Sequence, residues 1–161
     1  MLIQHYTTFD DIRAALGVGS KELKDDTLTL DLYSSALMAD LEDVSLAVPT
    51  TYTQALSSDP QSDAEIRFIN AAKVFATYSV AKHLTVSLPV FSPVKIEDGK
   101  AAMTRANDPH RETVAAVNRE FERWKSRLLA AYQSLVSESS VSVQRDYLSV
   151  ISPAEDPVTG L

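Results

Sequence analysis

The sequence predicts an all-α protein: a four-helix bundle with an inserted loop and an extended C-terminal arm. Two long segments with helical periodicity, residues 62–88 and 109–137, are separated by residues 89–108. That connection is too long for a simple helix–helix turn, which usually takes about 2–8 residues. The chain has 161 residues, 45% of them hydrophobic and 23% charged, which is typical of one globular domain. We expect a bundle domain over residues 1–140, with the loop 89–108 inserted, and an arm over residues 141–161.

Two shorter helices are predicted before these. Thr8 can cap a short helix that ends near Leu16, and Gly17 supplies its C-terminal stop. A second helix begins near Leu28 and is closed by Pro49. Its apolar residues recur three and four positions apart, which places them on one stripe. They are Leu30, Tyr33, Leu37, Leu41 and Val44. Residues 50–61 are predicted to be mostly loop, with a strand or a helical turn as the alternative.

The third helix begins with a capping box, in which Ser62 and Glu65 each bond the other's backbone amide. Its apolar residues fall on more than one face, so we expect it to lie centrally, with neighbours on several sides. The fourth helix has Asp108 as its N-cap and Pro109 at its first position. It carries the clearest period in the chain, a heptad-like seam. The seam consists of Val114, Val117, Phe121, Trp124, Leu128, Ala131 and Leu135.

The inserted loop and the C-terminal arm hold apolar residues with no evident place in a four-helix core. Asp98-Gly99 favours a short β-hairpin within the loop. Residues 141–151 have a strand-like composition, and residues 152–161 cannot bury enough apolar surface to fold alone. We predict that the two segments bind a partner, the alternative being that they fold back on their own bundle. The candidate partner-binding residues are Val90, Phe91, Val94, Ile96, Tyr147, Leu148, Val150 and Ile151.

The residue chemistry does not indicate catalysis. The chain has no cysteine, and it has no glycine-rich phosphate loop, so we expect no catalytic residue, cofactor or metal. His83 and His110 are better explained as structural residues than as ligands, because no convergent ligands accompany them. The formal net charge of −7 argues against tight binding of nucleic acid. The N-terminal residues do not resemble a signal peptide, and no apolar run approaches the roughly 20 residues of a membrane span.

Several stretches resemble the head–tail connector, or head-completion adaptor, family of tailed-bacteriophage neck proteins. The likeness spans most of the chain and rests on helix and turn patterns. It is carried by Phe9–Val18, by the leucine-rich second helix, by Phe75–Tyr78 followed by Leu88-Pro89, by Lys95–Lys100 continuing to Asn107–Pro109, and by Asp156–Gly160.

This resemblance implies a helical bundle that assembles as a ring, usually of twelve copies, beneath the portal protein at the capsid vertex. Such a ring joins head to tail, leaves a channel through which DNA passes without specific binding, and presents a platform for the next neck or tail protein. The protein would be made in the host cytoplasm and reside in the virion, away from any membrane. A tail-completion or stopper protein of the same neck stays open as an alternative. So do a small soluble helical binding or regulatory module and an enzyme of unrecognised type.

Overall fold

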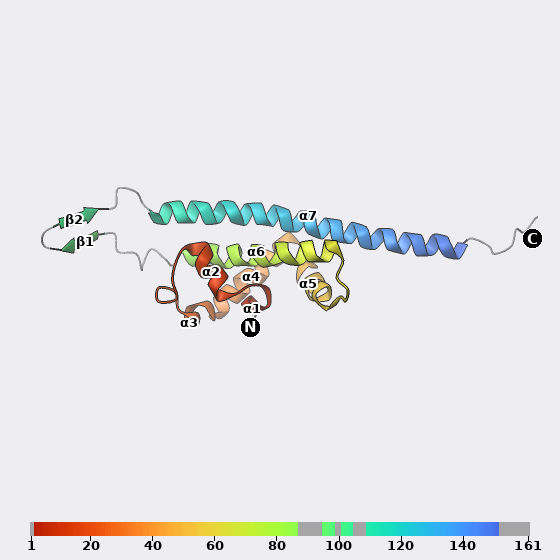
Figure 1. Ribbon diagram of the computed structural model, residues 1–161, viewed down its shortest axis with the longest axis horizontal. Helices are drawn as coiled ribbons and strands as arrows, with labels where there is room; N and C mark the ends of the chain where they lie inside the picture. The colour runs from red at the N-terminus through yellow and green to blue at the C-terminus, as the bar shows by residue number, and fades with distance from the viewer. Residues whose placement is uncertain (1, 87–94, 99–100, 105–108, 152–161) are drawn as a thin grey trace, which may run out of the picture.

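One helix, α7 (Pro109–Ile151), runs along almost the whole molecule, and the other helices gather along one side of it (Figure 1). The computed structural model describes residues 2–86, 95–98, 101–104 and 109–151, and places side chains for residues 2–86 and 111–138. The remaining helices are α1 (Leu2–Tyr6), α2 (Phe9–Leu16), α3 (Asp25–Leu28), α4 (Asp31–Val44), α5 (Val48–Ser57) and α6 (Asp63–Thr85). The predicted all-α class is confirmed.

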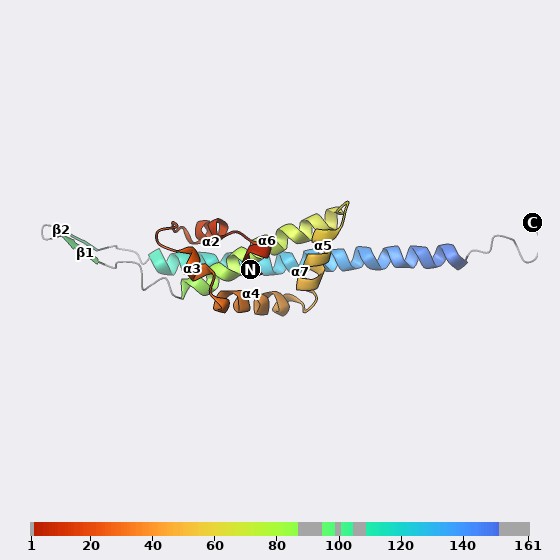
Figure 2. The same ribbon diagram turned by 90° about the horizontal axis from the view of Figure 1, so that it is seen from below.

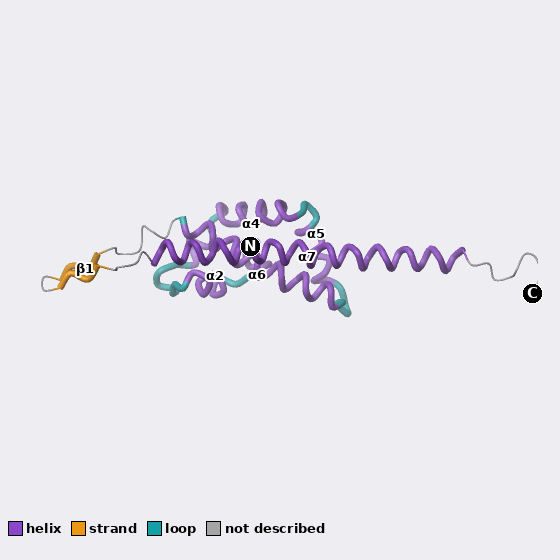
Figure 3. Tube along the Cα trace, turned by 90° about the horizontal axis from the view of Figure 1, so that it is seen from above, coloured by secondary structure: helices purple, strands orange, loops and turns teal. Residues whose placement is uncertain are grey.

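Helices α6 and α7 form the central pair of the fold. They run side by side, and α2 and α4 lie on opposite sides of them (Figures 2 and 3). The phenyl rings of Phe75 and Phe121 are 5.3 Å apart between centroids, and those of Phe68 and Tyr132 are 6.1 Å apart. Because rising numbers on α6 meet falling numbers on α7, the two helices are antiparallel.

The start and end of α2 follow the sequence prediction. The Thr8 hydroxyl accepts the backbone amide of Asp11 at 3.1 Å, which makes Thr8 the N-cap. Gly17 at the C-cap has a φ of 68°, a left-handed conformation that glycine adopts without steric cost. Its amide returns to the carbonyl of Ala14 at 3.2 Å and closes the helix.

The core is centred on α6, as its pattern predicted. Phe68, Ala72, Phe75, Ala76 and Val80 are all fully buried. They fall on several faces of the helix, which is in contact with α1, α2, α4, α5 and α7. The predicted capping box is present at its N-terminus: Glu65 N–H donates to Ser62 Oγ at 3.2 Å, and Ser62 N–H donates to Glu65 Oε2 at 2.7 Å.

The predicted seam of α7 faces this core. Val117, Phe121 and Leu128 are buried, and Trp124 and Leu135 are partly buried against the same cluster. Lys82 places its ammonium 3.8 Å from the centre of the Phe121 ring, a cation–π contact that covers the edge of the seam.

Two predictions of secondary structure are wrong. Residues 50–61 do not form a loop alone, because α5 runs from Val48 to Ser57 with Pro49 in its first turn and Tyr52 fully buried. The strand-like composition of residues 141–151 does not end α7, which continues to Ile151. Neither proline nor glycine interrupts the chain between Pro109 and that residue, so nothing local stops the helix.

The inserted segment contains two short strands. Strand β1 (Lys95–Asp98) pairs antiparallel with β2 (Ala101–Thr104), with Lys95 opposite Thr104 and Asp98 opposite Ala101. Both strands lie beyond the first turn of α7, at the end of the molecule away from Ile151 (Figure 1).

Removing the Ser62 hydroxyl should destabilise the fold through α6. For Ser62→Ala we expect a loss of about 1 kcal/mol in the free energy of unfolding, because one N-terminal amide loses its acceptor. Urea denaturation followed by circular dichroism measures it. The matched control is Ser126→Ala, since that exposed hydroxyl only bonds back to the Glu122 carbonyl of its own helix. An equal loss in both variants would contradict the assigned cap.

The capping box formed by Ser62 and Glu65 should also make the free energy of unfolding depend on pH. Hydrogen bonds from the Ser62 amide and the Ser58 hydroxyl lower the pKa of Glu65 from its ordinary value of 4.5. A carboxyl group whose pKa is lower in the folded chain than in the unfolded chain stabilises the fold at pH values above its ordinary pKa. This gain in stability is lost as the pH falls through the pKa of the folded state. Glu65→Gln should therefore be less stable than the wild type at neutral pH, with the difference closing in acid. Denaturation at several pH values checks this, and a constant difference would refute it.

Candidate functional site

A polar cluster joins α4 to α6. Asp40 Oδ2 accepts hydrogen bonds from Ser79 Oγ at 2.7 Å and from His83 Nε2 at 3.0 Å. Ser79 is fully buried, whereas His83 and Asp40 are partly exposed. Activation of a serine needs a base that accepts its proton and a third group that orients that base. Here serine and histidine both bond one carboxylate oxygen, so the arrangement ties two helices together and does not assemble a nucleophile.

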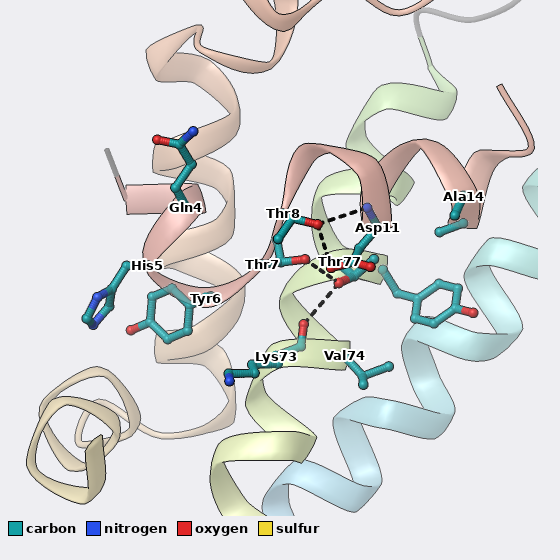
Figure 4. Close-up of a pocket in the computed structure, with 12 residues that line it drawn as sticks. Gln4, His5, Tyr6, Thr7, Thr8, Asp11, Ala14, Lys73, Val74 and Thr77 are labelled. Carbon is teal, nitrogen blue, oxygen red and sulfur yellow. Dashed lines mark hydrogen bonds between the residues drawn. The ribbon is translucent and has the colours of Figure 1, made fainter. Parts of the chain in front are cut away.

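An open groove of about 620 Å³ lies between α1, α2 and α6 (Figure 4). On its floor, Thr7 Oγ1 and Thr77 Oγ1 share a buried hydrogen bond of 2.6 Å, and Thr77 also donates to the Lys73 carbonyl at 3.1 Å. At its rim, the Thr8 hydroxyl donates to Asp11 at 2.6 Å. These hydroxyl groups are engaged with each other or with the backbone, so they do not converge on a position where a ligand would sit.

Beside this groove, two tyrosines anchor α1 to α5. The rings of Tyr6 and Tyr52 stack with centroids 4.4 Å apart, and the Tyr52 hydroxyl donates to the His5 carbonyl at 3.3 Å. Burial raises the pKa of Tyr52 to about 12, so its hydroxyl stays protonated and remains a donor at physiological pH. The role of this pair is structural.

The structure separates the two predicted partner-binding segments. Ile96 lies on β1 at one end of the molecule, and the predicted residues from Tyr147 to Ile151 lie on the last turns of α7 at the other end (Figure 1). Val90, Phe91 and Val94 fall outside the described residues. The candidate surface therefore consists of two ends that one copy of the chain does not bring together.

Helix α7 is longer than the bundle that supports it. Since Phe68 lies near Tyr132 and the helices are antiparallel, the first residue of α6, Asp63, comes opposite about residue 137. Residues 138–151, which we call the α7 overhang, continue past α6 (Figure 1). At 1.5 Å per residue the overhang extends by about 20 Å.

Exposed apolar side chains lie on one flank of α7. Lys125 forms an ion pair with Asp43 near the end of α4, and this pair lowers the pKa of Asp43 from its ordinary value of 3.8. Leu129 is four residues beyond Lys125 and so lies on the same side of the helix. It is 40% exposed, and Val136, seven residues further on, is 48% exposed. The apolar flank thus appears where α4 no longer covers α7.

The sequence analysis did not detect this flank, because it assigned a single apolar seam to this helix. The available signal was the seven-residue spacing of Leu129, Val136, Val143 and Val150. Within the described residues, no group of three or more His, Cys, Asp or Glu is placed to hold a metal ion. No helix in that part of the chain is both long and apolar enough to cross a membrane.

Comparisons of the chain with protein-family models, with curated proteins and with solved structures find no match.

Removing the Asp40 carboxylate should destabilise the α4–α6 contact. We expect Asp40→Ala to cost about 1–3 kcal/mol, because the buried Ser79 hydroxyl loses its acceptor. The control is Glu42→Ala, which removes an exposed carboxylate from the same helix. Thermal and urea denaturation measure both. If Asp40→Ala proves no more harmful than the control, the cluster does not hold these helices together.

Proposed function

We propose that this protein is a structural adaptor of a tailed-phage neck, a ring beneath the portal that joins head to tail and leaves a channel for DNA. The observation that carries the proposal is the separation of the hairpin and the α7 overhang at opposite ends of one long helix. An adaptor must contact one neighbour above it and another below it. A long helix that carries a projecting segment at each end suits that task.

The packing of α7 against α6 supports the same proposal. Its seam from Val117 to Leu135 is fixed on α6 by buried apolar contacts, whereas the overhang leaves its own bundle. Surface that is not covered within one chain is available to another polypeptide. In this proposal the end from Tyr147 onward docks on the portal, and the inserted segment at residues 89–108 contacts a neighbouring copy or the downstream neck or tail protein.

The charge of the chain is compatible with a channel through which DNA passes without being bound. The chain carries 15 Lys and Arg residues against 22 Asp and Glu residues. Residues 1–65 account for more than the whole excess, with 3 basic and 12 acidic side chains. A duplex is held through cations that neutralise its phosphates, so an acidic wall adds little attraction. In this proposal the work of the protein is mechanical, its location is the virion neck, and it uses no cofactor.

Truncation of the C-terminal end tests the docking role. Removal of residues 147–161 should leave the helical content nearly unchanged, because the core seam ends at Leu135, and should abolish binding to the portal protein. Circular dichroism and a pull-down on assembled portal measure the two effects. A shorter truncation of residues 152–161 shows whether the last turns of α7 contribute. If the chain without residues 147–161 unfolds, or binds portal as before, the assignment fails.

A charged substitution tests whether the inserted segment contacts another polypeptide. Phe91→Asp should reduce assembly into neck complexes by more than it lowers the melting temperature of the free chain, because the proposal places this residue against another polypeptide. Phe91→Leu is the matched control and should assemble normally. A large fall in the melting temperature with unchanged assembly would mean that the segment belongs to the core of its own chain.

A further inference from the structure

Acidic and basic side chains are segregated along this chain. Residues 25–66 contain nine acidic side chains and no lysine or arginine, whereas residues 67–96 contain four cations and no acid. Helix α4 lies in the first stretch and carries four acids. Two of them have basic partners within the chain, because Asp40 bonds His83 and Asp43 pairs with Lys125. The other two, Asp31 and Glu42, form no ion pair among the described residues.

These two acids lie on the outer face of α4. The buried side chains of the helix are Tyr33, Leu37 and Leu41. Every side chain on the opposite side is exposed, with apolar or small residues in the middle and an acid at each end. This outer face consists of Asp31, Leu32, Ser35, Ala39 and Glu42. Leu32 is 68% exposed, and Leu46, in the turn after the helix, is 80% exposed.

A stripe of arginines lies on the outer face of α7, away from the helices that gather along its other side (Figure 1). Arg119, Arg123 and Arg127 are four residues apart and all exposed. At 100° per residue, Arg119 and Arg123 each lie about 160° around the axis from the buried Phe121. The exposed side chains between and beside the arginines are small ones, Ala115, Ser126 and Ala130.

Two of these arginines are held in place by their own helix. The Arg127 guanidinium lies 4.7 Å from the centre of the Trp124 ring, and Arg123 pairs with Glu120 at 3.3 Å. Arg119 forms no ion pair among the described residues. The stripe is therefore a partly ordered cationic surface that nothing in the described chain covers.

We propose that the outer face of α4 in one chain packs on the arginine stripe of α7 in a second copy. Charge complementarity selects this occupant, because one chain presents an acidic apolar face and a basic face with small residues on different sides. The lengths also agree: at 1.5 Å per residue, Asp31 to Glu42 spans about 17 Å and Arg119 to Arg127 about 12 Å. Leu32 would then pack on small residues and on arginine stems.

The contact joins two different surfaces, so it is head-to-tail and each chain can touch two neighbours. It deepens the neck proposal and rests on it for the closure of the copies into a ring. DNA is the other polyanion that an arginine stripe can meet. A second copy is favoured because it covers both faces at once, whereas DNA would leave Leu32 and Leu46 exposed and would meet Glu120 and Glu122 beside the arginines.

The salt dependence of self-association tests the nature of the contact without any substitution. For the purified full-length protein, sedimentation should show association several-fold weaker in about 500 mM than in about 50 mM NaCl, because salt screens the opposite charges. Chains with a net charge of −7 that met through apolar groups alone would associate more strongly in high salt, which screens their repulsion. That result, or a chain that stays monomeric at its highest soluble concentration, overturns the proposal.

Charge reversal locates the contact. Arg119→Glu and Glu42→Arg each bring like charges together and should weaken self-association about tenfold or more. The matched controls are Lys73→Glu, in the groove beside α2, and Glu138→Arg, near the end of the described side chains of α7. They change the net charge equally and should alter association little. All four side chains are exposed, so the melting temperature should stay at the wild-type value.

Mixing the two reversed variants tests the head-to-tail geometry. In an equal mixture of Arg119→Glu and Glu42→Arg, each chain brings the intact surface that the other lacks. Association should therefore recover to near the wild-type strength. If mixing restores nothing, or if the reversals act no more strongly than their controls, the contact is overturned.

The remaining outcomes separate this contact from DNA binding and from the neck function. If the wild type binds a DNA duplex, and Arg119→Glu abolishes that binding but leaves self-association intact, the stripe serves DNA and the proposal falls. If truncation of residues 147–161 abolishes portal binding while the reversals leave self-association unchanged, the neck function stands without this contact. If mixing restores association but the chain does not bind portal, the contact stands and the neck function falls.

Discussion

The burial of α6 is the constraint on which the rest of the structure depends. Its phenylalanine and alanine side chains are enclosed by α1, α2, α4, α5 and α7, and each fully buried large side chain contributes about 1.5–3 kcal/mol. The small residues, Ala72 and Ala76 among them, let the neighbouring helices approach closely. Helix α7 is fixed because its seam completes this core, and it is fixed only as far as α6 extends.

That limit leaves the last part of α7 without support from α6. A helix of 43 residues is supported along its first part and projects along the rest. The polar cluster at Asp40, the stacked tyrosines and the groove beside α2 are internally satisfied, and they explain how the short helices are attached to α6. The proposal that another polypeptide binds this protein rests on the exposed apolar side chains of the α7 flank and on the overhang beyond them.

Local sequence signals predicted the helices whose ends are marked by capping residues or by glycine. Thr8 with Gly17, and Ser62 with Glu65, mark helix ends within a few residues of sequence, and the spacing of the α7 seam identifies its buried face. Helix α5 was missed because Thr51-Tyr52-Thr53 favours a strand locally, and burial of Tyr52 beneath α1 overrides that preference. The Asp40 cluster could not be predicted, since its members are 39 and 43 residues apart and only tertiary packing unites them.

Hydrogen–deuterium exchange of the amides in residues 139–151 tests the central claim most directly. The account predicts rapid exchange there in a dilute monomer, while the amides of α6 stay protected, and strong protection of the same segment once copies or the portal are bound. Protection in the dilute monomer equal to that of α6 would mean that the chain covers its own long helix, and it would contradict the account.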